Sequence, residues 1–339
     1  MKITIAMKTT IAVLLCICTS LTGLAVDSEI PFRVDHNAPL DATESVVKDA
    51  ADHLHLRVEF NGIDGDRVPA FLYIPKNEKE SHPTVFLQYG SGGSKKTDYI
   101  VQIGKQFVDN GFVVLTIDSA FRGERRHPDK KDPFVLKQMD YRRFEHYCAD
   151  YSRAVDYLMQ RKEVDTERLA FVGISWGAIT GITFVAHEPR VKVMGSLVGG
   201  GGFPVFFTGR ESDDPEIARP SLDPADHVGK IAPRPLVMVN VTLDLLVAPM
   251  FAKALHAAAG RNSSAIWYET DHYFNGQDRV KIVQEDVIDF LLKHMPKSRR
   301  KRNKTKRRLA RWLHYLVTAL AATTLDKSTN TYQTPFDHL

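Results

Sequence analysis

The pentapeptide Gly173-Ile174-Ser175-Trp176-Gly177 limits the folds open to this chain more than any other feature. The apolar run 169–172 precedes it, and small or apolar residues follow at 178–186, a pattern typical of a buried strand, a sharp turn and a helix. The residues two before and two after the serine crowd against the strand and the helix at such a turn, so only very small side chains fit there. The spacing predicts a serine hydroxyl raised above the end of a strand, where it can act as a nucleophile.

Strand and helix patterns alternate through residues 53–294. Two alternating segments, 53–60 and 68–74, flank the turn-rich link 61–66 and predict an antiparallel hairpin. The strands predicted after it are 84–88, 112–117, 169–174, 191–198, 236–241 and 264–268, and the helices are 99–110, 147–160, 178–186, 248–259 and 278–294. Repeated β-α units require a parallel sheet covered by helices. The predicted fold class is α/β, with a mostly parallel central sheet, helices on both faces and an N-terminal antiparallel hairpin.

Composition divides the chain into four segments. They are a signal peptide at 1–25, a lead-in at 26–52 with a short helix near 42–51, a catalytic domain at 53–296, and a basic, partly amphipathic tail at 297–339. Two stretches of the domain, at about 119–145 and 199–231, break the alternation and follow strand ends. Since open α/β sheets place their sites at that edge, we expect these insertions to cap the site or line its pocket. Plain surface loops are the alternative.

The first segment has the layout of a secretory signal peptide. Lys2 and Lys8 precede the apolar stretch 11–18, and the small-x-small pattern that ends at Ala25 predicts cleavage there. A short membrane anchor is the alternative, but the apolar stretch is short for a spanning helix. Cys148 is then the one cysteine of the mature chain, so the chain forms no internal disulfide. We expect a secreted or periplasmic protein.

A catalytic triad can be chosen from the order of residues along the chain. A serine hydroxyl is a poor nucleophile until a histidine, oriented by a carboxylate, takes its proton. In chains with this strand–serine–helix turn, the acid and then the histidine follow later strands. Asp244 lies just beyond the strand 236–241, and His272 lies just beyond the strand 264–268. Ser175, Asp244 and His272 are therefore the predicted triad.

Other acids and histidines fit this arrangement less well. Asp271 adjoins His272, but neighbouring side chains rarely point so that one orients the other, and Glu269 is the better spare acid. Three histidines lie upstream of the last strand and are interpreted as helix-end or surface residues. They are His187, His227 and His256.

The oxyanion that forms during acyl transfer needs two N–H donors. One is predicted to be the backbone N–H of Trp176, and the other is expected from the glycine-rich loop 89–94, with Ser91 as first candidate and Gly92 as second. That loop lacks the Gly-Lys-Ser/Thr ending of a nucleotide-binding loop. The sequence also contains no metal-binding motif. The predicted chemistry needs no cofactor and no metal.

Aromatic and basic residues in the two insertions are candidates for substrate binding. They are Phe121, Arg122, Phe203 and Phe206. Aromatic residues at these positions could equally belong to the core, and arginines in a loop are commonly solvated.

The residues around the serine resemble the α/β-hydrolase superfamily, in particular the branch of dienelactone-hydrolase-like proteins and acetyl xylan esterases. The similarity is carried by 164–178, by 117–125 and by the surroundings of Asp244 and His272, and it spans about residues 53–294. It implies the α/β-hydrolase fold and ester hydrolysis through an acyl-enzyme. Two positions depart from the pattern: dienelactone hydrolases carry cysteine where this chain has Ser175, and Tyr89 replaces the usual histidine before the oxyanion loop. The resemblance therefore implies plain ester cleavage more than lactone chemistry.

The charge of the chain is unevenly distributed. From Lys297 onward there are 11 Lys/Arg and 2 Asp/Glu, whereas the remainder holds 34 Lys/Arg and 39 Asp/Glu. The catalytic body is mildly acidic, so it is not expected to bind nucleic acid. Apolar residues recur at helical spacing between 309 and 320. Two interpretations of 297–325 stay open: contact with an anionic membrane surface or cell-wall polymer, and an extension irrelevant to catalysis.

Together these features predict a serine carboxylic-ester hydrolase that favours small, acetyl-type acyl groups. Its substrate would be a small-molecule or carbohydrate-linked ester. A serine peptidase of the same fold, or a non-catalytic hydrolase-fold protein that binds a partner, are the alternatives.

Overall fold

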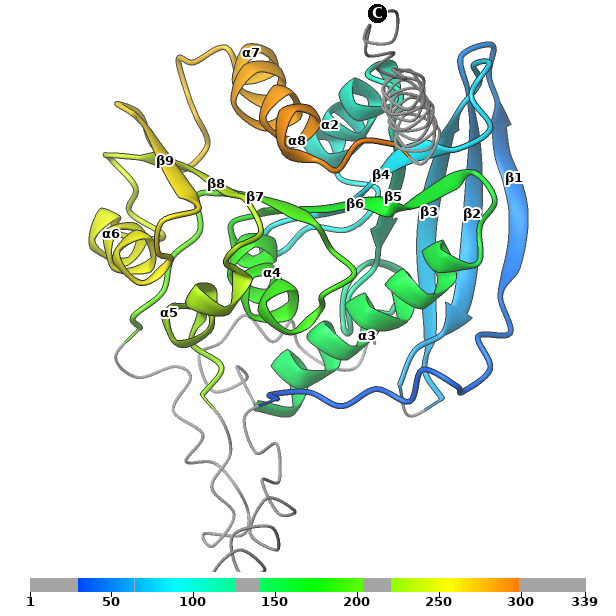
Figure 1. Cartoon of the computed structure of the whole chain (residues 1–339), viewed down its shortest axis with the longest axis horizontal. Coiled ribbons are helices and arrows are strands. Elements are labelled where there is room, and N and C mark those ends of the chain that lie inside the picture. The colour runs from blue at the N-terminus through cyan, green and yellow to red at the C-terminus, as the bar shows by residue number, and fades with distance from the viewer. Residues whose placement is uncertain (1–29, 64, 126–140, 204–220, 299–339) are drawn as a thin grey trace, which may run out of the picture.

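The computed structural model describes residues 30–63, 65–125, 141–203 and 221–298 (Figure 1). Within these residues, nine strands form one sheet in the order β1-β2-β3-β5-β4-β6-β7-β8-β9. The first three strands pair antiparallel with one another, β3 pairs antiparallel with β5, and the remaining pairs are parallel. The predicted α/β class with a mostly parallel sheet and an N-terminal hairpin is therefore confirmed.

The strand bounds follow the predicted pattern closely after the hairpin. The strands are β1 (Thr43–Asp49), β2 (His53–Asn61), β3 (Arg67–Pro75), β4 (His82–Gln88), β5 (Val113–Ile117), β6 (Val164–Ile174), β7 (Val193–Leu197), β8 (Leu236–Val241) and β9 (Ser263–Tyr268). Strands β4, β5, β7 and β8 are buried along their whole length. This burial is expected for strands covered on both faces, and it explains why their sequences are mostly apolar.

The helices cover both faces of the sheet. They are α2 (Asp98–Asp109), α3 (Tyr141–Met159), α4 (Trp176–His187), α5 (Pro224–His227), α6 (Pro249–Ala258), α7 (Arg279–Ile282) and α8 (Asp289–His294). Short 3-10 segments form η1 (Gly123–Arg125) and η3 (Val228–Ile231), and a π-helical segment, η4 (Val283–Ile288), joins α7 to α8. Figure 1 shows α2, α7 and α8 over one face and α3 and α4 over the other.

Each face of the sheet has its own apolar core. One core includes Phe86 and Phe171 of the sheet with Tyr151 of α3 and Phe184 of α4. Their four rings lie 5.2 to 6.4 Å apart in edge-on or tilted pairs. The other core packs α2, α7, η4 and α8 against the opposite face. Two cores of this kind fix the sheet between helix layers, and its carboxyl edge is held rigidly.

The expected short helix near 42–51 is wrong, because this segment forms the edge strand β1. Every residue of β1 is exposed, and the strand pairs antiparallel with β2 around a bulge between Val46 and Lys48. β-Branched Val46 and Val47 favour extended backbone. The hydrogen bonds that hold the strand come from β2, which local sequence cannot reveal.

Helix α3 begins at Tyr141, six residues before the expected start at 147. Cys148 consequently lies inside this helix, fully buried, and its thiol points at the carbonyl oxygen of Thr180, 3.8 Å away. Burial raises the pKa of the thiol well above its ordinary value. Cys148 is thus a packing residue.

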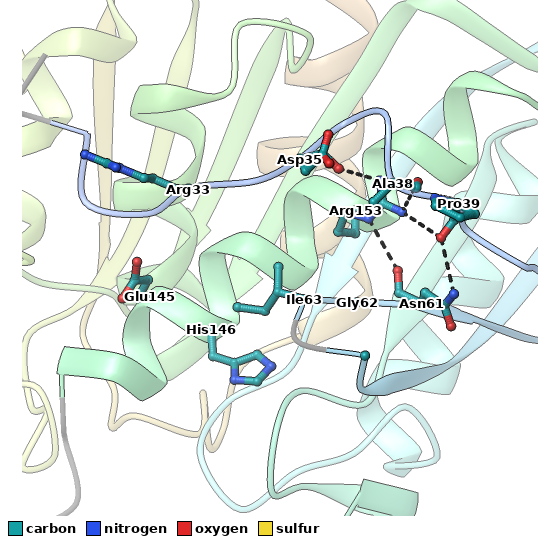
Figure 2. Close-up of a pocket in the computed structure, with 11 residues that line it drawn as sticks. Arg33, Asp35, Ala38, Pro39, Asn61, Gly62, Ile63, Glu145, His146 and Arg153 are labelled. Atoms are coloured by element: carbon teal, nitrogen blue, oxygen red, sulfur yellow. Dashed lines mark hydrogen bonds between the residues drawn. The ribbon is translucent and has the colours of Figure 1, made fainter.

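Arg153 of α3 fixes the lead-in to the body (Figure 2). Its buried guanidinium donates to the carbonyl oxygens of Asp35, Ala38 and Pro39 at 2.7 to 3.2 Å. The side chain also forms one wall of a pocket of about 790 Å³, which the triad residues do not line. Arg153 therefore holds the lead-in through hydrogen bonds that occupy most of the N–H groups of its guanidinium.

Several predictions concern residues outside the described part of the chain. They are the signal peptide at 1–25, the tail beyond 298, Phe206, and the middle portions of both insertions. Among the described residues, no helix has the length and apolar character needed to cross a membrane.

Candidate active site

The turn between β6 and α4 has the strained geometry that the glycine spacing predicts. Ser175 has φ 53° and ψ −116°, a conformation that side chains rarely adopt. A Cβ atom at Gly173 would lie 2.3 Å from the carbonyl oxygen of Gly177, and one at Gly177 would lie 2.5 Å from that of Tyr89. The serine N–H donates to the carbonyl oxygen of Leu197 at 2.8 Å, which ties the turn to β7. Backbone crowding therefore excludes side chains at both glycines.

The structure brings Ser175, His272 and Asp244 together in one hydrogen-bonded line. His272 Nε2 lies 2.9 Å from Ser175 Oγ, and His272 Nδ1 lies 2.7 Å from Asp244 Oδ2. Both the histidine and the aspartate are almost fully buried. Because an ionised carboxylate only accepts, the Nδ1 proton points at Asp244, and Nε2 is left to accept from the serine hydroxyl.

Asp244 is held in its ionised form by its surroundings. Its Oδ1 accepts the backbone N–H groups of Leu246 and Val247 at 2.9 and 2.8 Å. Burial alone raises the pKa of this carboxyl, but the hydrogen bonds from His272, Val247 and Leu246 outweigh it, so the pKa lies below its ordinary value. The carboxylate can thus orient His272 and stabilise its protonated form.

The loops that carry Asp244 and His272 are joined along their backbones. The N–H of Thr242 donates to the carbonyl oxygen of Tyr268, and the N–H of Leu243 donates to that of Thr270, both at 3.0 Å. The Thr270 hydroxyl in turn donates to the carbonyl oxygen of Asn275 at 2.6 Å. The parallel pairing of β8 with β9 therefore continues into the loops and sets the separation of acid and base.

The competing acids and histidines have other partners or lie elsewhere. Asp271 accepts the N–H groups of Tyr273 and Asn275 at 3.0 and 3.1 Å, so it caps its own loop. His187 and His227, the last residues of α4 and α5, pair with each other at 3.0 Å. Exposed positions are occupied by Glu269 and by His256 on α6.

The predicted oxyanion loop lies directly against the serine. A Cβ atom at Gly90 would lie 3.1 Å from Ser175 Cβ. Residues 90–93 form a tight turn in which the N–H of Gly93 donates to the carbonyl oxygen of Gly90 at 3.2 Å and Gly92 has φ 78°. Ser91 follows Gly90 in this turn, and Trp176 follows the serine at the start of α4. Trp176 thus adjoins Ser175 in the chain, and Ser91 adjoins Gly90, which lies against Ser175.

Sequence reasoning missed the residues that hold this loop. The Tyr99 hydroxyl accepts the N–H of Gly90 at 2.8 Å. Fully buried Lys95 donates its backbone N–H to Asp118 Oδ1 at 2.9 Å, and its ammonium contacts Asp118 Oδ2 and, at 2.8 Å, Glu124 Oε1. These contacts join the loop after β4 to the loop after β5. The one sequence signal was Asp118 itself, a charged residue directly after a buried strand.

Glu124 completes this ionic cluster at its solvent side. Burial raises the pKa of its carboxyl, but hydrogen bonds from Lys95 and Arg57 prevail and lower it to about 2. Its N–H donates to Asp118 Oδ2 at 2.9 Å, beside Gly123, which has φ 51°. A Cβ atom at Gly123 would collide with the Asp118 carboxylate at 2.2 Å. The cluster therefore shapes the whole turn 118–125.

The predicted substrate-binding residues have mixed environments. Phe121 is partly buried against the core and has φ 63°, and Arg122 is 9% exposed, so it is not a solvated loop arginine. Phe203 packs against Phe251 with ring centroids 4.7 Å apart. The Trp176 ring meets Phe144 edge-on at 6.0 Å.

Among the described residues, no group of three metal-ligating side chains comes together.

Comparison with known proteins relates the chain to a hydrolase family. Residues 68–219 match the Dienelactone hydrolase family. The chain is 25% identical over 218 residues to the thiohydrolase aneE of Aspergillus aculeatus. The matched region covers 62% of this chain and 63% of aneE, just under two thirds of that protein. It is 24% identical over 263 residues to the putative hydrolase YtaP of Bacillus subtilis, with 70% and 86% of the two chains covered.

Solved structures share the fold. The acetyl xylan esterase from Paenibacillus sp. R4 matches with a TM-score of 0.61 and 18% identity, over 76% of this chain and 90% of that one. A cold-adapted esterase from an Arctic intertidal metagenomic library matches with a TM-score of 0.59 and 18% identity, over 76% and 99%. The strained serine turn, the strand order of the sheet and the matched region 68–219 all indicate the same fold. The chain therefore has the α/β-hydrolase fold, and its residues 68–219 match the Dienelactone hydrolase family.

Proposed function

We propose that this protein is a serine carboxylic-ester hydrolase that acts through an acyl-enzyme and favours small, acetyl-type acyl groups. The observation that carries the proposal is the line from Ser175 Oγ through His272 to Asp244, with hydrogen bonds of 2.9 and 2.7 Å. These distances and the buried, ionised acid suit a histidine that takes a proton from the serine hydroxyl.

The first half of the reaction forms the acyl-enzyme. Ser175 Oγ attacks the ester carbonyl carbon while its proton passes to His272 Nε2, and the carbonyl oxygen becomes an oxyanion. The N–H of Trp176 and an N–H of the turn at Ser91 or Gly92 donate to that oxygen. The carbon–oxygen bond to the alcohol then breaks, and His272 returns the proton to the departing oxygen.

The second half releases the acid. A water molecule gives a proton to His272 Nε2 and attacks the acyl carbon, and the new oxyanion meets the same two donors. Its collapse returns the proton to Ser175 and frees the carboxylic acid. Asp244 balances the charge of His272 in both halves, so the cycle uses no cofactor.

The acyl preference is supported by the proteins whose structures share this fold. Two of the matched folds are acetyl xylan esterases, whose acyl group is acetyl. Dienelactone hydrolases carry cysteine at the position of Ser175, so the serine favours cleavage of plain esters over lactone hydrolysis. A peptidase and a non-catalytic binding protein of the same fold are the alternatives that the test below separates.

The test is hydrolysis of p-nitrophenyl acetate and butyrate by the full chain beside Ser175→Ala. We expect the variant to lose at least about a thousandfold in kcat, because the nucleophile is gone. Ser264→Ala, which removes an exposed serine from β9, is the matched control and should keep full activity. A fluorophosphonate probe should label the wild type and not Ser175→Ala.

Three results would overturn the proposal. Equal activity of wild type and Ser175→Ala would exclude Ser175 as the nucleophile. Inactivity of both together with no probe labelling would favour the binding protein. Cleavage of peptides at rates above those for acetate esters would favour the peptidase.

A further inference from the structure

Large apolar side chains are exposed around the loops that carry Asp244 and His272. We call these five residues the apolar collar: Leu243, Leu245, Leu246, Met250 and Tyr273. Their exposed fractions run from 58% to 95%, and they are five of the twelve most exposed large apolar residues in the described part of the chain. Such a concentration beside a reactive group marks a binding surface rather than scattered surface residues.

The geometry of the acid loop forces these side chains outward. The backbone N–H groups of Leu246 and Val247 turn inward to Asp244 Oδ1, at 2.9 and 2.8 Å. The side chains of Leu245 and Leu246 are left in solvent, with exposed fractions of 95% and 64%. Their exposure therefore follows from the same hydrogen bonds that hold the carboxylate.

The histidine loop contributes Tyr273 to the collar. Tyr273 directly follows His272, and its ring lies edge-on to the imidazole with centroids 5.6 Å apart. Residues 272 to 274 alternate, with His272 and Phe274 buried and Tyr273 63% exposed. The N–H of Leu243 donates to the carbonyl oxygen of Thr270, so the two loops present one surface.

The collar continues inward as apolar surface. A Cβ atom at Gly200 would lie 2.8 Å from Val247 Cγ1 and 3.0 Å from Phe251 Cβ, so the chain after β7 lies against the acid loop. Phe251 adjoins Met250 of the collar and packs against Phe203, with the two rings tilted at 37°. An apolar path therefore leads from the exposed leucines toward the glycines that follow β7.

The chemistry decides which part of a substrate meets this surface. His272 Nε2 must protonate the oxygen of the departing alcohol, so that oxygen lies within hydrogen-bonding distance of the imidazole. The carbonyl oxygen must turn the other way, toward Trp176 and the Ser91 turn. The alcohol group therefore leaves the serine on the His272 side, where the collar lies.

We propose that the apolar collar binds the alcohol portion of the substrate, and that the preferred substrates are esters of small acids with hydrophobic alcohols. The inference rests on the proposed ester hydrolysis and narrows it. Alkyl or aryl alcohols bury apolar surface against Leu245, Leu246 and Tyr273, whereas a sugar alcohol leaves those side chains wet.

The test compares two series of esters with the full chain, below their solubility limits. One series keeps the acetyl group and lengthens the alcohol, from ethyl through butyl and hexyl to octyl acetate. The other keeps ethanol and lengthens the acid, from acetate to octanoate. We expect kcat/KM to rise about twofold to fourfold per methylene in the alcohol series, mainly through KM, and to stay flat or fall in the acid series.

A variant connects the slope to the collar. In Leu245→Ser/Leu246→Ser the ratio of kcat/KM for octyl over ethyl acetate should fall at least about tenfold, since two apolar contacts are lost. Val280→Ser on α7 is the matched control, because Val280 is also 64% exposed but lies outside the collar, and it should keep the wild-type ratio. Thermal unfolding of both variants checks that the fold is intact.

The outcomes separate this inference from the proposed function. Hydrolysis that depends on Ser175 but shows no rise in the alcohol series would overturn the collar proposal and leave the esterase standing. A rise in the acid series instead would assign the collar to the acyl group, which also contradicts the proposal. Loss of all Ser175-dependent ester hydrolysis would remove both.

Discussion

At the scale of single residues, Asp244 and Asp271 lie close together in the fold yet have opposite environments. Asp244 is buried and contacts His272, while Asp271 caps its own loop through Tyr273 and Asn275. Asp244→Asn should therefore lower kcat by about a thousandfold to ten-thousandfold with a small change in KM, because the amide no longer fixes the histidine tautomer. Steady-state kinetics on p-nitrophenyl acetate measures this loss.

Asp271→Asn is the control for that prediction. The substitution keeps the shape of the loop and removes the same charge one residue from His272, so we expect less than about a threefold change in kcat. If both variants lost activity equally, charge near the histidine, and not a specific orienting bond, would explain the effect.

At Gly173 and Gly177, on either side of Ser175, the atoms that a larger side chain would strike belong to the backbone and not to flexible side chains. Gly177→Ala would place a Cβ atom 2.5 Å from the carbonyl oxygen of Tyr89 and 2.7 Å from that of Gln88. Since neither carbonyl can move without shifting β4, we expect a loss of about 2 to 4 kcal/mol in the free energy of unfolding. Urea unfolding followed by circular dichroism measures it.

Gly104→Ala on α2 provides the contrast. Its Cβ atom would meet only side chains, the nearest at 3.8 Å, which is ordinary van der Waals contact. Because alanine is the better helix former, this variant should gain up to about 1 kcal/mol. A similar loss in both variants would show that burial alone, and not crowding at the serine turn, limits these positions.

The order of residues along the chain was enough to choose the three side chains that the structure brings together. Ser175, Asp244 and His272 each follow a parallel strand, and parallel strands end at one edge of a sheet. Lys95 could not be chosen in this way, since its partners Asp118 and Glu124 belong to a different loop. The contact of Tyr99 with Gly90 likewise depends on how α2 docks on the sheet.

At the scale of elements, the sequence pattern predicted the strands that are buried and apolar. It failed for elements whose conformation depends on hydrogen bonds or contacts with another element. The strand 236–241 was predicted with the bounds of β8, because all six residues are buried and all but Asn240 are apolar. Strand β1 was predicted as helix, since its hydrogen bonds come from β2 and its side chains are exposed. The start of α3 at Tyr141 and the π-helical segment after α7 were likewise not predicted.

The ionic cluster of Lys95, Asp118 and Glu124 couples two elements of the site edge. Lys95→Met should lower the free energy of unfolding by about 3 to 5 kcal/mol, because Asp118 is then buried with its charge uncompensated. The loop after β4 should loosen as well, so kcat should fall more than KM rises. Urea unfolding and ester kinetics measure the two effects.

The same substitution at an exposed pair is the control. Lys105→Met removes solvent-exposed ion pairs with Asp109 at 2.8 Å and with Asp52 at 3.6 Å, so it should cost less than about 0.5 kcal/mol. The double variant Lys95→Met/Asp118→Asn should regain part of the stability lost in Lys95→Met, because no buried charge is left unpaired. No recovery would show that Lys95 acts by packing alone.

At the scale of the whole molecule, the two faces of the sheet differ in what they bury. The face under α3 and α4 is closed by interlocked aromatic rings, whereas near β2 and β3 the opposite face carries a half-buried imidazole. His55 stacks on Tyr73 with centroids 4.2 Å apart and meets Phe71 edge-on at 4.5 Å. Its Nε2 is buried and has no hydrogen-bonding partner among the described residues. A neutral ring suits this position better than a charged one.

His55 should make the stability of the whole fold sensitive to acid. Burial, with smaller contributions from His53 and Lys48, lowers the pKa of His55 from 6.5 to about 4. Between these two values the unfolded chain binds a proton that the folded chain does not, so the free energy of unfolding falls as the pH drops from 7 toward 4. Above pH 7 both states are neutral at this residue, and the effect vanishes.

Replacing His55 by a residue that does not titrate should remove this part of the acid sensitivity. The difference in urea midpoint between His55→Phe and the wild type should increase in favour of the variant as the pH is lowered from 7 to 5. His55→Gln separates charge from packing: it can be less stable than the wild type at pH 7, yet its pH dependence should be reduced to the same extent. A difference that stays constant between pH 7 and pH 5 in both variants would show that His55 takes up its proton equally in the folded and unfolded states.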